Sequence, residues 1–533
     1  MRRKVPGAGK QVETYNRKEI AMRRSAAAVS GILAMVASAG ATLAAGVEVL
    51  YLDAIAVERG VAQLFIDDEL IATQDNLKRT LHQPVKDDGG NVPIIASGPN
   101  SSLWAYGTIV YDTRREKYVM FIQEFPSRAM FLTTSEDGLT WDARTHDELT
   151  PVTMDMDLGE LPPEAGRFEI DLFSCFYDKN DPEFPYKGWA WFANAGYEWE
   201  GIWYLRSRDG LDWERPHQIL DGYAGPGDPT YRSITQDGRT LYGPGDVTTF
   251  YYDEVEDRFL GLFKFFSPYP VRPGFGSRSR AYAFFDRMDE PIDPDIFTHV
   301  ELVPPMAEKD GDHLFDEYYA STAWRYESLW LGGLKIFHTR GDYPYSAADC
   351  AFLKLVVSRD GLHWNKVPFA NDDGIPEVFI ANGPEGGNDG QNDGGYICEF
   401  SQGPLRIGDE LIYYYTSTSR GKQPHPRRLM GGGLFRARLR IDGFVSVDWG
   451  TLTTRPLILE GDDLTVNGIG PITVRALDAG GNPLAVARIE EGDSLAHPVT
   501  FDGRTLSELT DDGTVRLQFE VDWRGRLYSF KVD

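Results

Sequence analysis

The sequence is poor in cysteine and histidine, with three and nine residues of these types among 533. Cys175, Cys350 and Cys398 are too few for a disulfide framework, and no Cys-x-x-Cys spacing occurs. We expect all three to be small core residues. No pair of histidines has the spacing of metal ligands on one strand or helix, so no zinc site is predicted.

Positive charge is also scarce. The chain has 54 Lys and Arg residues against 81 Asp and Glu, a formal net charge of −27. Such an excess of negative charge argues against nucleic acids and anionic membrane surfaces as main partners. We interpret it as a source of solubility outside the cell.

Long apolar runs are missing except near the N-terminus. An alanine-rich run from Ser25 to Ala45 follows Arg23-Arg24, and small residues close it. A basic region, an apolar stretch and small residues are the pattern of a secretory signal. We therefore expect residues 1–45 to be a signal peptide with an upstream extension, and the mature protein to be secreted or periplasmic. A membrane anchor is the alternative, but the run is short, so we expect no stable membrane insertion after cleavage.

What the sequence does have is a repeated turn. The pattern Ser-x-Asp-Gly-x-x-Trp begins at Ser135, Ser207 and Ser358, and its aspartates are 72 and 151 residues apart. Because 151 is close to twice 75, a degenerate copy is expected between the second and the third. The strand that ends at Asp286 fits this copy, and a fifth copy ends at Asp442. Strands that recur with such a turn are typical of radial repeats.

Each repeat can be divided into four short strands with alternating or continuous apolar patterns. The sequence therefore predicts an all-β fold, with a five-bladed β-propeller over residues 46–446. Residues 447–533 lack the Asp-Gly-Trp turn and predict a C-terminal β-sandwich. Within each turn the Gly supplies positive φ and the Asp caps backbone amides, and we expect the Trp to pack between blades. The turns are therefore assigned to the scaffold.

Acidic residues recur at the start of the predicted innermost strands. Three of these strands end in Tyr-Asp, and counting back seven residues from Asp178 and Asp253 leads to Asp171 and Asp246. Glu317 and Asp393 lie near the matching points of the fourth and fifth units. Neighbouring carboxylates shift each other's pKa, and glycoside cleavage uses such a pair. We expect no cofactor; alternatively, these acids cap turns or bind a cation such as calcium on the propeller axis.

Candidate substrate-binding residues lie in the same regions. Tyr106 and Trp199 are flat rings that can stack on a sugar, although most aromatic residues in such a protein belong to the core. Arg280 adjoins a Gly- and Pro-rich loop and can meet a carboxylate or sulfate, unless the loop is merely solvated. His338 is a candidate for binding a hydroxyl group or a metal.

The repeat count and three segments carry a family resemblance. The segments are Leu64-Phe-Ile-Asp-Asp-Glu-Leu70, Leu81-His-Gln-Pro84 and Leu527-Tyr-Ser-Phe530. With the five repeats, they resemble the five-bladed β-propeller glycoside hydrolases of families 32 and 43, in an exported bacterial branch. The turns also resemble the Asp-boxes of sialidases, but those enzymes have six blades and an arginine triad that we do not find here.

The resemblance covers about residues 60–446, and the C-terminal part is similar to the accessory domain of family 32. It implies that three acids from successive inner strands cleave a glycosidic bond. Asp171 and Asp246 stand at the kind of position that the second and third acids occupy, whereas Ala105 stands where the first is expected.

We therefore expect an exported glycoside hydrolase whose substrate is a poly- or oligosaccharide. Asp246 is the predicted catalytic carboxylate, Asp171 its partner or pKa modulator, and Glu317 or Asp393 the general acid. The alternatives are a non-catalytic carbohydrate-binding propeller and a scaffold for protein interactions.

Overall fold

The computed structural model describes residues 53–98, 100–106, 109–155, 169–193, 200–221, 232–267, 277–305, 312, 316–338, 350–371, 374, 377–384, 392–400, 402–421, 431–510 and 513–533. The predicted signal sequence lies outside these ranges. These ranges contain strands β1 to β36 and three short 3-10 helices, η1 (Asp87–Gly90), η2 (His146–Glu148) and η3 (Pro294–Ile296). The expectation of an all-β fold is confirmed. No helix in these ranges has the length and hydropathy needed to cross a bilayer.

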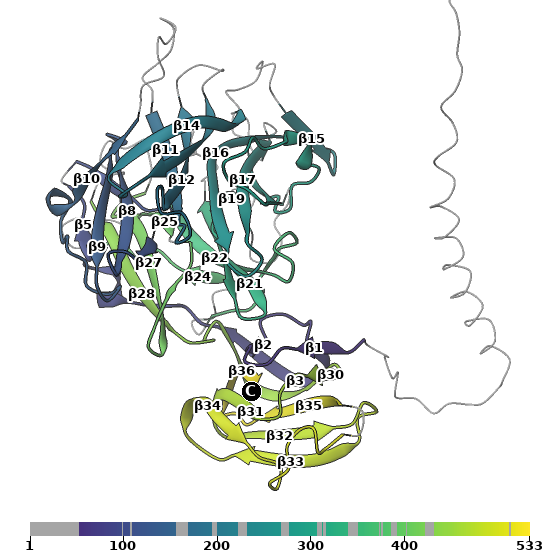
Figure 1. Ribbon diagram of the computed structural model, residues 1–533. Helices are drawn as coiled ribbons and strands as arrows, with labels where there is room; N and C mark the ends of the chain where they lie inside the picture. Colours follow the sequence, from purple (N-terminus) through teal and green to yellow (C-terminus); the bar gives the residue numbers. More distant parts are fainter. Residues whose placement is uncertain are drawn as a thin grey trace, which may run out of the picture. The chain divides into compact units, whose positions relative to one another are not determined.

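Five antiparallel meanders, numbered 1 to 5 here, follow one another along the chain (Figure 1). Meander 1 consists of β6 (Ser102–Trp104), β7 (Ile109–Asp112), β8 (Lys117–Phe125), β9 (Met130–Ser135) and β10 (Thr150–Met154). Meander 2 consists of β11 (Glu169–Tyr177), β12 (Tyr186–Ala193), β13 (Gly201–Ser207) and β14 (Asp212–Asp221). Meander 3 consists of β15 (Arg232–Gln236), β16 (Arg239–Asp253), β17 (Arg258–Ser267) and β18 (Ser277–Phe285).

Meander 4 consists of β19 (Asp316–Ser321), β20 (Trp324–Tyr326), β21 (Leu329–His338), β22 (Ala351–Ser358), β23 (Asn365–Lys366) and β24 (Val378–Ile380). Meander 5 consists of β25 (Tyr396–Phe400), β26 (Leu405–Ile407), β27 (Glu410–Thr418) and β28 (Gly433–Arg440). Its outer edge is completed by β4 (Val85–Lys86) and β5 (Ile95–Ala96), which both pair with β28. The segment before meander 1 thus closes the sheet of meander 5.

Aromatic contacts show which meanders are neighbours. The tryptophans of the three repeated turns each meet a ring of another meander, with centroids 5.1–5.6 Å apart: Trp141 and Tyr414, Trp213 and Phe121, Trp364 and Tyr282. Two further pairs join meander 2 to 3 and meander 4 to 5: Trp189 and Phe250, Trp324 and Tyr413. Each meander therefore contacts the next, and the fifth contacts the first. The expectation that these tryptophans pack between repeats is confirmed.

The repeated aspartates cap their own turns, as predicted. Asp137 Oδ1 accepts hydrogen bonds from the backbone N–H groups of Thr140 (2.6 Å) and Leu139 (2.8 Å), and Gly138 has a φ of 69°. Asp209 and Asp360 make the same pair of bonds in the second and third turns. These bonds, that from Thr140 first, lower the pKa of Asp137 to about 2.

The low pKa of Asp137 predicts a pH-dependent contribution to stability. An Asp137→Ala variant should be less stable than wild type by about 1 kcal/mol near neutral pH, the usual net value of one or two exposed hydrogen bonds. The depressed pKa stabilises the fold above the unfolded-state value of 3.8, and this is lost as the pH falls through about 2. Urea unfolding of both proteins at several pH values measures the difference. A difference that stays constant down to pH 2 would contradict the capping role.

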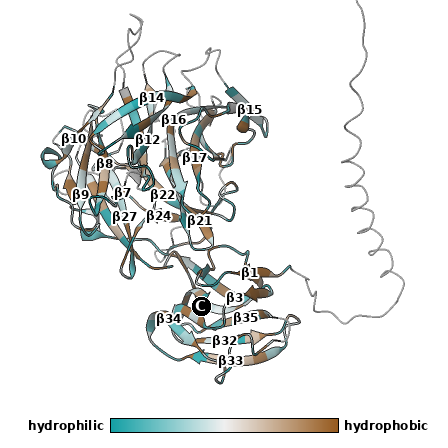
Figure 2. Cartoon of the chain, in the orientation of Figure 1, coloured by the Kyte–Doolittle hydropathy of each residue, from teal (hydrophilic) through white to brown (hydrophobic). Residues whose placement is uncertain are grey.

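A separate sheet gathers strands from both ends of the described chain. Its C-terminal members are β29 (Val445–Thr454), β30 (Leu457–Leu459), β31 (Leu464–Ile469), β32 (Ile472–Leu477), β33 (Pro483–Ile489), β34 (Asp493–Val499), β35 (Thr514–Val521) and β36 (Arg526–Val532). Its N-terminal members are β1 (Ile55–Val57), β2 (Gln63–Leu64) and β3 (Ile71–Leu81). Polar and apolar residues alternate along its strands, most regularly in β35, and the apolar side faces one core (Figure 2). Residues 55–81 thus belong to the same sheet as the C-terminal strands.

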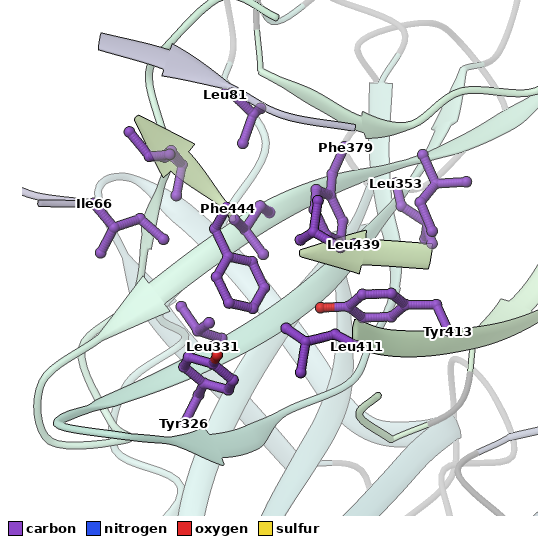
Figure 3. Close-up of a cluster of buried hydrophobic side chains, with 14 of the residues drawn as sticks. Ile66, Leu81, Tyr326, Leu331, Leu353, Phe379, Leu411, Tyr413, Leu439 and Phe444 are labelled. Atoms are coloured by element: carbon purple, nitrogen blue, oxygen red, sulfur yellow. The ribbon is translucent and has the colours of Figure 1, made fainter. Parts of the chain in front are cut away.

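A buried junction joins this sheet to the meanders. Side chains of meanders 4 and 5 pack with Ile66 and Leu81 of the N-terminal segment in one apolar cluster (Figure 3). Beside this cluster the buried Asp442 accepts hydrogen bonds from Tyr326 Oη (2.7 Å) of meander 4 and Ser529 Oγ (2.6 Å) of β36. Asp442, which the repeat pattern marked as a turn residue, therefore connects three parts of the fold.

Candidate functional site

The inner strands of meanders 2, 4 and 5 begin at the same end of their sheets. In each, the first residues pair with the last residues of the following strand: Glu169 with Ala193, Asp316 with His338, Tyr396 with Thr418. The predicted site residues Asp171 and Glu317 lie within three residues of these starts. The acids of different meanders therefore lie at corresponding points of their strands.

An apolar cluster contains residues from the inner strands of all five meanders. Its members from consecutive meanders include Trp104, Leu172, Val247, Tyr319 and Cys398. Four of these residues lie where the pairing register slips, at bulges in β11, β16, β19 and β25. Bulges redirect neighbouring side chains, and they are common next to active sites. The five meanders thus converge on one core, with an irregularity at the same place in four of them.

Asp171 is anchored by a cation from the neighbouring meander. Its carboxylate forms an ion pair with Arg128, which lies in the turn between β8 and β9. The Arg128 guanidinium is 4.6 Å from the ring centroid of Phe125 and 5.6 Å from that of Trp104. Leu172, the next residue, has a φ of 58°, which is rare for a bulky side chain and turns the strand at the bulge. Meander 1 therefore contributes an arginine to the site.

Asp246 is the most accessible of the three inner-strand acids, with 41% of its side chain exposed against 15% for Asp171 and 5% for Glu317. It forms an ion pair with Lys264 on β17. A Cβ on Gly245 would lie 2.5 Å from Lys264 Cε, so the glycine leaves room for the lysine side chain. Asp246 thus combines an anchoring cation with access to a ligand.

Glu317 belongs to a group of charged and aromatic side chains at the start of meander 4. It forms an ion pair with Arg278, whose guanidinium is 4.5 Å from the Tyr319 ring centroid. Burial lowers the pKa of Arg278, but the Glu317 charge outweighs it and the pKa lies above the ordinary value. On β21 the buried Lys335 places its ammonium 4.7 Å from the Tyr319 centroid and 4.2 Å from that of Tyr396.

His338 and Asp316 form a second acid-base contact next to Glu317. His338 Nδ1 lies 2.7 Å from Asp316 Oδ1, and 30% of the histidine side chain is exposed. With Nδ1 donating to this carboxylate, the imidazole orientation is fixed by the contact. His338 therefore lies at the same strand ends as the candidate acids.

Asp393 occupies a different environment. Its side chain is 1% exposed, pairs with Lys86 of β4 and accepts a hydrogen bond from Tyr415 Oη (2.8 Å). A Cβ on Gly90 would lie 2.6 Å from the carboxylate. Asp393 thus holds the N-terminal strand against meander 5, enclosed by protein atoms.

The remaining predicted residues are distributed unevenly. Tyr106 is buried in the central apolar cluster, and Trp199 lies outside the described residues. Ala105 is 3% exposed, so its methyl group is not accessible to a ligand. Arg280 is fully buried, where Nη2 donates to Leu262 O (2.9 Å) and Nε to Ser321 Oγ (3.1 Å). These contacts place Arg280 inside the fold.

The burial of Arg280 predicts an effect on stability. An Arg280→Met variant should lose about 3 kcal/mol, because buried carbonyl groups lose their donors and a void replaces the guanidinium. Guanidinium chloride unfolding measures the change. Arg287→Met, at an exposed arginine whose partners Asp289 and Glu290 are also exposed, should cost much less and is the control. Equal effects of the two substitutions would contradict the structural role.

The site acids do not form a metal cage in the described part of the chain. No group of three or more His, Cys, Asp or Glu side chains there has the arrangement of a metal site. Arg128, Lys264 and Arg278 form ion pairs with Asp171, Asp246 and Glu317. Sequence reasoning missed Arg128 and Lys264, because neither belongs to a repeated motif and each meets its acid only through folding.

No family model matches the sequence, and no curated protein matches it. Among solved structures, the chain is similar to one described as a glycoside hydrolase (TM-score 0.38, 11% identity), with 67% of this chain and 92% of that one covered. It is also similar to a member of the GH130 family of mannoside phosphorylases, which contains glycoside hydrolases that target β-1,2 mannosidic linkages in Candida mannan (0.37, 12%; 70% and 96% covered). A third is the GH43 β-1,3-galactosidase BT0265 (0.38, 11%; 78% and 75% covered). With identities and TM-scores this low, these proteins say nothing of what this chain binds or cleaves.

Proposed function

We propose that the protein is an exported glycoside hydrolase that cleaves a poly- or oligosaccharide at the bulged parts of the inner strands, which carry Asp171, Asp246 and Glu317. In this proposal the five meanders are the blades of a β-propeller, and the sheet formed by β1–β3 and β29–β36 is an accessory β-sandwich. Contacts between successive meanders, and between the fifth and the first, support the propeller arrangement.

One observation carries the proposal. Three consecutive meanders each place an acid next to the bulge of the inner strand, and each acid forms an ion pair with a basic side chain. Glycosidases use a pair of carboxylates that flank the scissile bond, one donating a proton and the other attacking or activating water. Rigid anchoring by a cation is a way to fix such a pair before substrate binds.

The exposure of the acids suggests their roles. Asp246, the most accessible, is the carboxylate that acts at the sugar carbon. Glu317 comes from meander 4 and Asp171 from meander 2, so that they approach from either side of Asp246. We assign Glu317 as the proton donor, a role that requires it to take up a proton and loosen its contact with Arg278 when substrate binds, and Asp171 as the partner that orients the bound sugar. The enclosure of Asp393 favours Glu317 over it as the general acid.

A non-catalytic carbohydrate-binding protein is the second candidate. Ala105 in place of an acid in meander 1 favours it, since binding needs aromatic rings and hydrogen-bond donors but no carboxylate pair. Arg128, Lys264 and Arg278 are suitable donors to sugar hydroxyls.

Incubation of the purified protein with a panel of neutral and acidic glycans distinguishes the two functions. Release of reducing sugar by wild type, and its loss in Asp246→Asn, is the result expected of the hydrolase. Binding of a glycan without any release of sugar would support the second candidate. Equal release by both proteins would overturn the assignment of Asp246.

A further inference from the structure

A cavity of about 460 Å³ lies away from the candidate site, where the N-terminal segment crosses the third repeated turn. The N-terminal segment contributes Ile66 and Asp67 to its lining, and the turn contributes Ser358, Arg359, Asp360 and His363. Its volume falls within the roughly 300–1,000 Å³ typical of small-molecule sites. The repeated turns were assigned to the scaffold, but the third turn also lines a cavity.

The cavity and the candidate site lie at opposite ends of β21. Trp330 near the start of β21 pairs with Ser358, at the turn, whereas His338 at its end pairs with Asp316, at the candidate site. Eight residues of extended strand separate Trp330 from His338, which corresponds to about 26 Å at 3.3 Å per residue. A mono- or disaccharide cannot contact both places, but a longer chain can.

The charged groups that line the cavity are all paired, most of them with one another and Lys366 with Asp312 and Glu377 behind it. Arg359 donates through Nε and Nη2 to both carboxylate oxygens of Asp67 (2.9 and 2.7 Å). Arg79 pairs with Asp68, and His363 Nδ1 lies 2.6 Å from Asp360 Oδ2. Because these charges cancel pair by pair, the cavity has little net charge to select an ion. It offers donors and acceptors side by side, which is what hydroxyl groups require.

Two polar groups and an apolar floor complete the lining. The Asn365 side chain and His363 Nε2 have no hydrogen-bond partner among the described residues, and both side chains are exposed. Pro368 and Phe369 supply exposed carbon surface, whereas Ile66 and Val357 are almost fully buried. An apolar base with a few convergent polar groups is the usual composition of a small-molecule site.

We propose that this cavity is a second carbohydrate-binding site, which holds a neutral sugar unit of a polysaccharide about 26 Å from the cleavage site. The hydroxyl groups of the sugar bind Asn365, His363 and the Arg359–Asp67 pair, and its carbon face lies on Pro368 and Phe369. The choice of a sugar as the ligand rests on the proposed function. Occupation of both sites by one chain raises the affinity for long substrates without changing the chemistry.

The test compares the double variant His363→Ala/Asn365→Ala with a matched control. The control, Asp212→Ala/Glu214→Ala, changes the same two positions of the second repeated turn. In the first experiment, KM of both double variants is measured for the preferred polysaccharide and for its disaccharide. In the second, Asp246→Asn is added to each protein, and calorimetry measures the binding of the polysaccharide, of neutral disaccharides and of a uronic acid.

We expect KM for the polysaccharide to rise about tenfold in the His363/Asn365 variant, the size expected for two lost hydrogen bonds, with KM for the disaccharide unchanged. An unchanged KM for the polysaccharide, or an equal rise for both substrates, would overturn the proposal. Calorimetric preference for the uronic acid would also overturn it, since the ligand would then be an anion. Wild type that cleaves no glycan would count only against the hydrolase. If it still binds a neutral sugar, and the His363/Asn365 variant does not, the second site is supported. If no neutral sugar binds to the protein, the proposal of a second site is overturned.

Discussion

Replacing Asp246 with asparagine should lower kcat on the preferred glycan by about 10²- to 10⁴-fold, the contribution typical of a positioned catalytic group. The substitution keeps the size of the side chain and removes its charge, so that the carboxylate can neither attack nor activate water. KM should change much less, because an amide still forms hydrogen bonds to sugar hydroxyls. Steady-state kinetics on one defined glycan measures both quantities.

Two controls separate the chemistry of Asp246 from its effect on the fold. Asp209→Asn makes the same change in the second repeated turn, where the aspartate caps backbone amides, and should leave kcat unchanged. Lys264→Met removes the cation that anchors Asp246 and should lower kcat by a smaller factor, because the carboxylate remains but is held less firmly. If Asp209→Asn reduces kcat as much as Asp246→Asn, the loss reflects a general disturbance of the protein.

The repeated turn made the scaffold predictable. Ser, Asp, Gly and Trp at fixed offsets specify a capped turn with a left-handed glycine, and Asp137 and Gly138 behave as expected. The Tyr-Asp register also led to Asp171 and Asp246, each of which lies next to the bulge of its inner strand. Local chemistry thus determines both the turns and the register.

The repeated sequence pattern could not predict contacts between residues that are far apart in the chain. Arg280 adjoins a loop in sequence, yet the fold buries it against Leu262 and Ser321. Asp393 looked like another acid at a strand start, but Lys86 of an N-terminal strand encloses it. Such partners lie 18 to 307 residues away, and no periodicity encodes them.

Asp442→Ala should destabilise the protein by about 3–5 kcal/mol, the largest effect on stability that we expect from one substitution. The buried carboxylate accepts hydrogen bonds from Tyr326 Oη, Ser529 Oγ and Asn467 Nδ2. Removing it leaves three buried donors without their acceptor and cuts the contact between meander 4 and the sheet of β31 and β36. Chemical unfolding followed by tryptophan fluorescence measures the loss.

Asp442→Asn is the matched control for this effect. Asparagine tolerates the φ of 61° at this position and retains one acceptor oxygen, so it should cost only a part of the loss. A double-mutant cycle of Asp442→Ala with Tyr326→Phe should give a coupling energy of about 1–3 kcal/mol, since the two side chains share one hydrogen bond. Additive effects in this cycle would contradict a direct role of the contact.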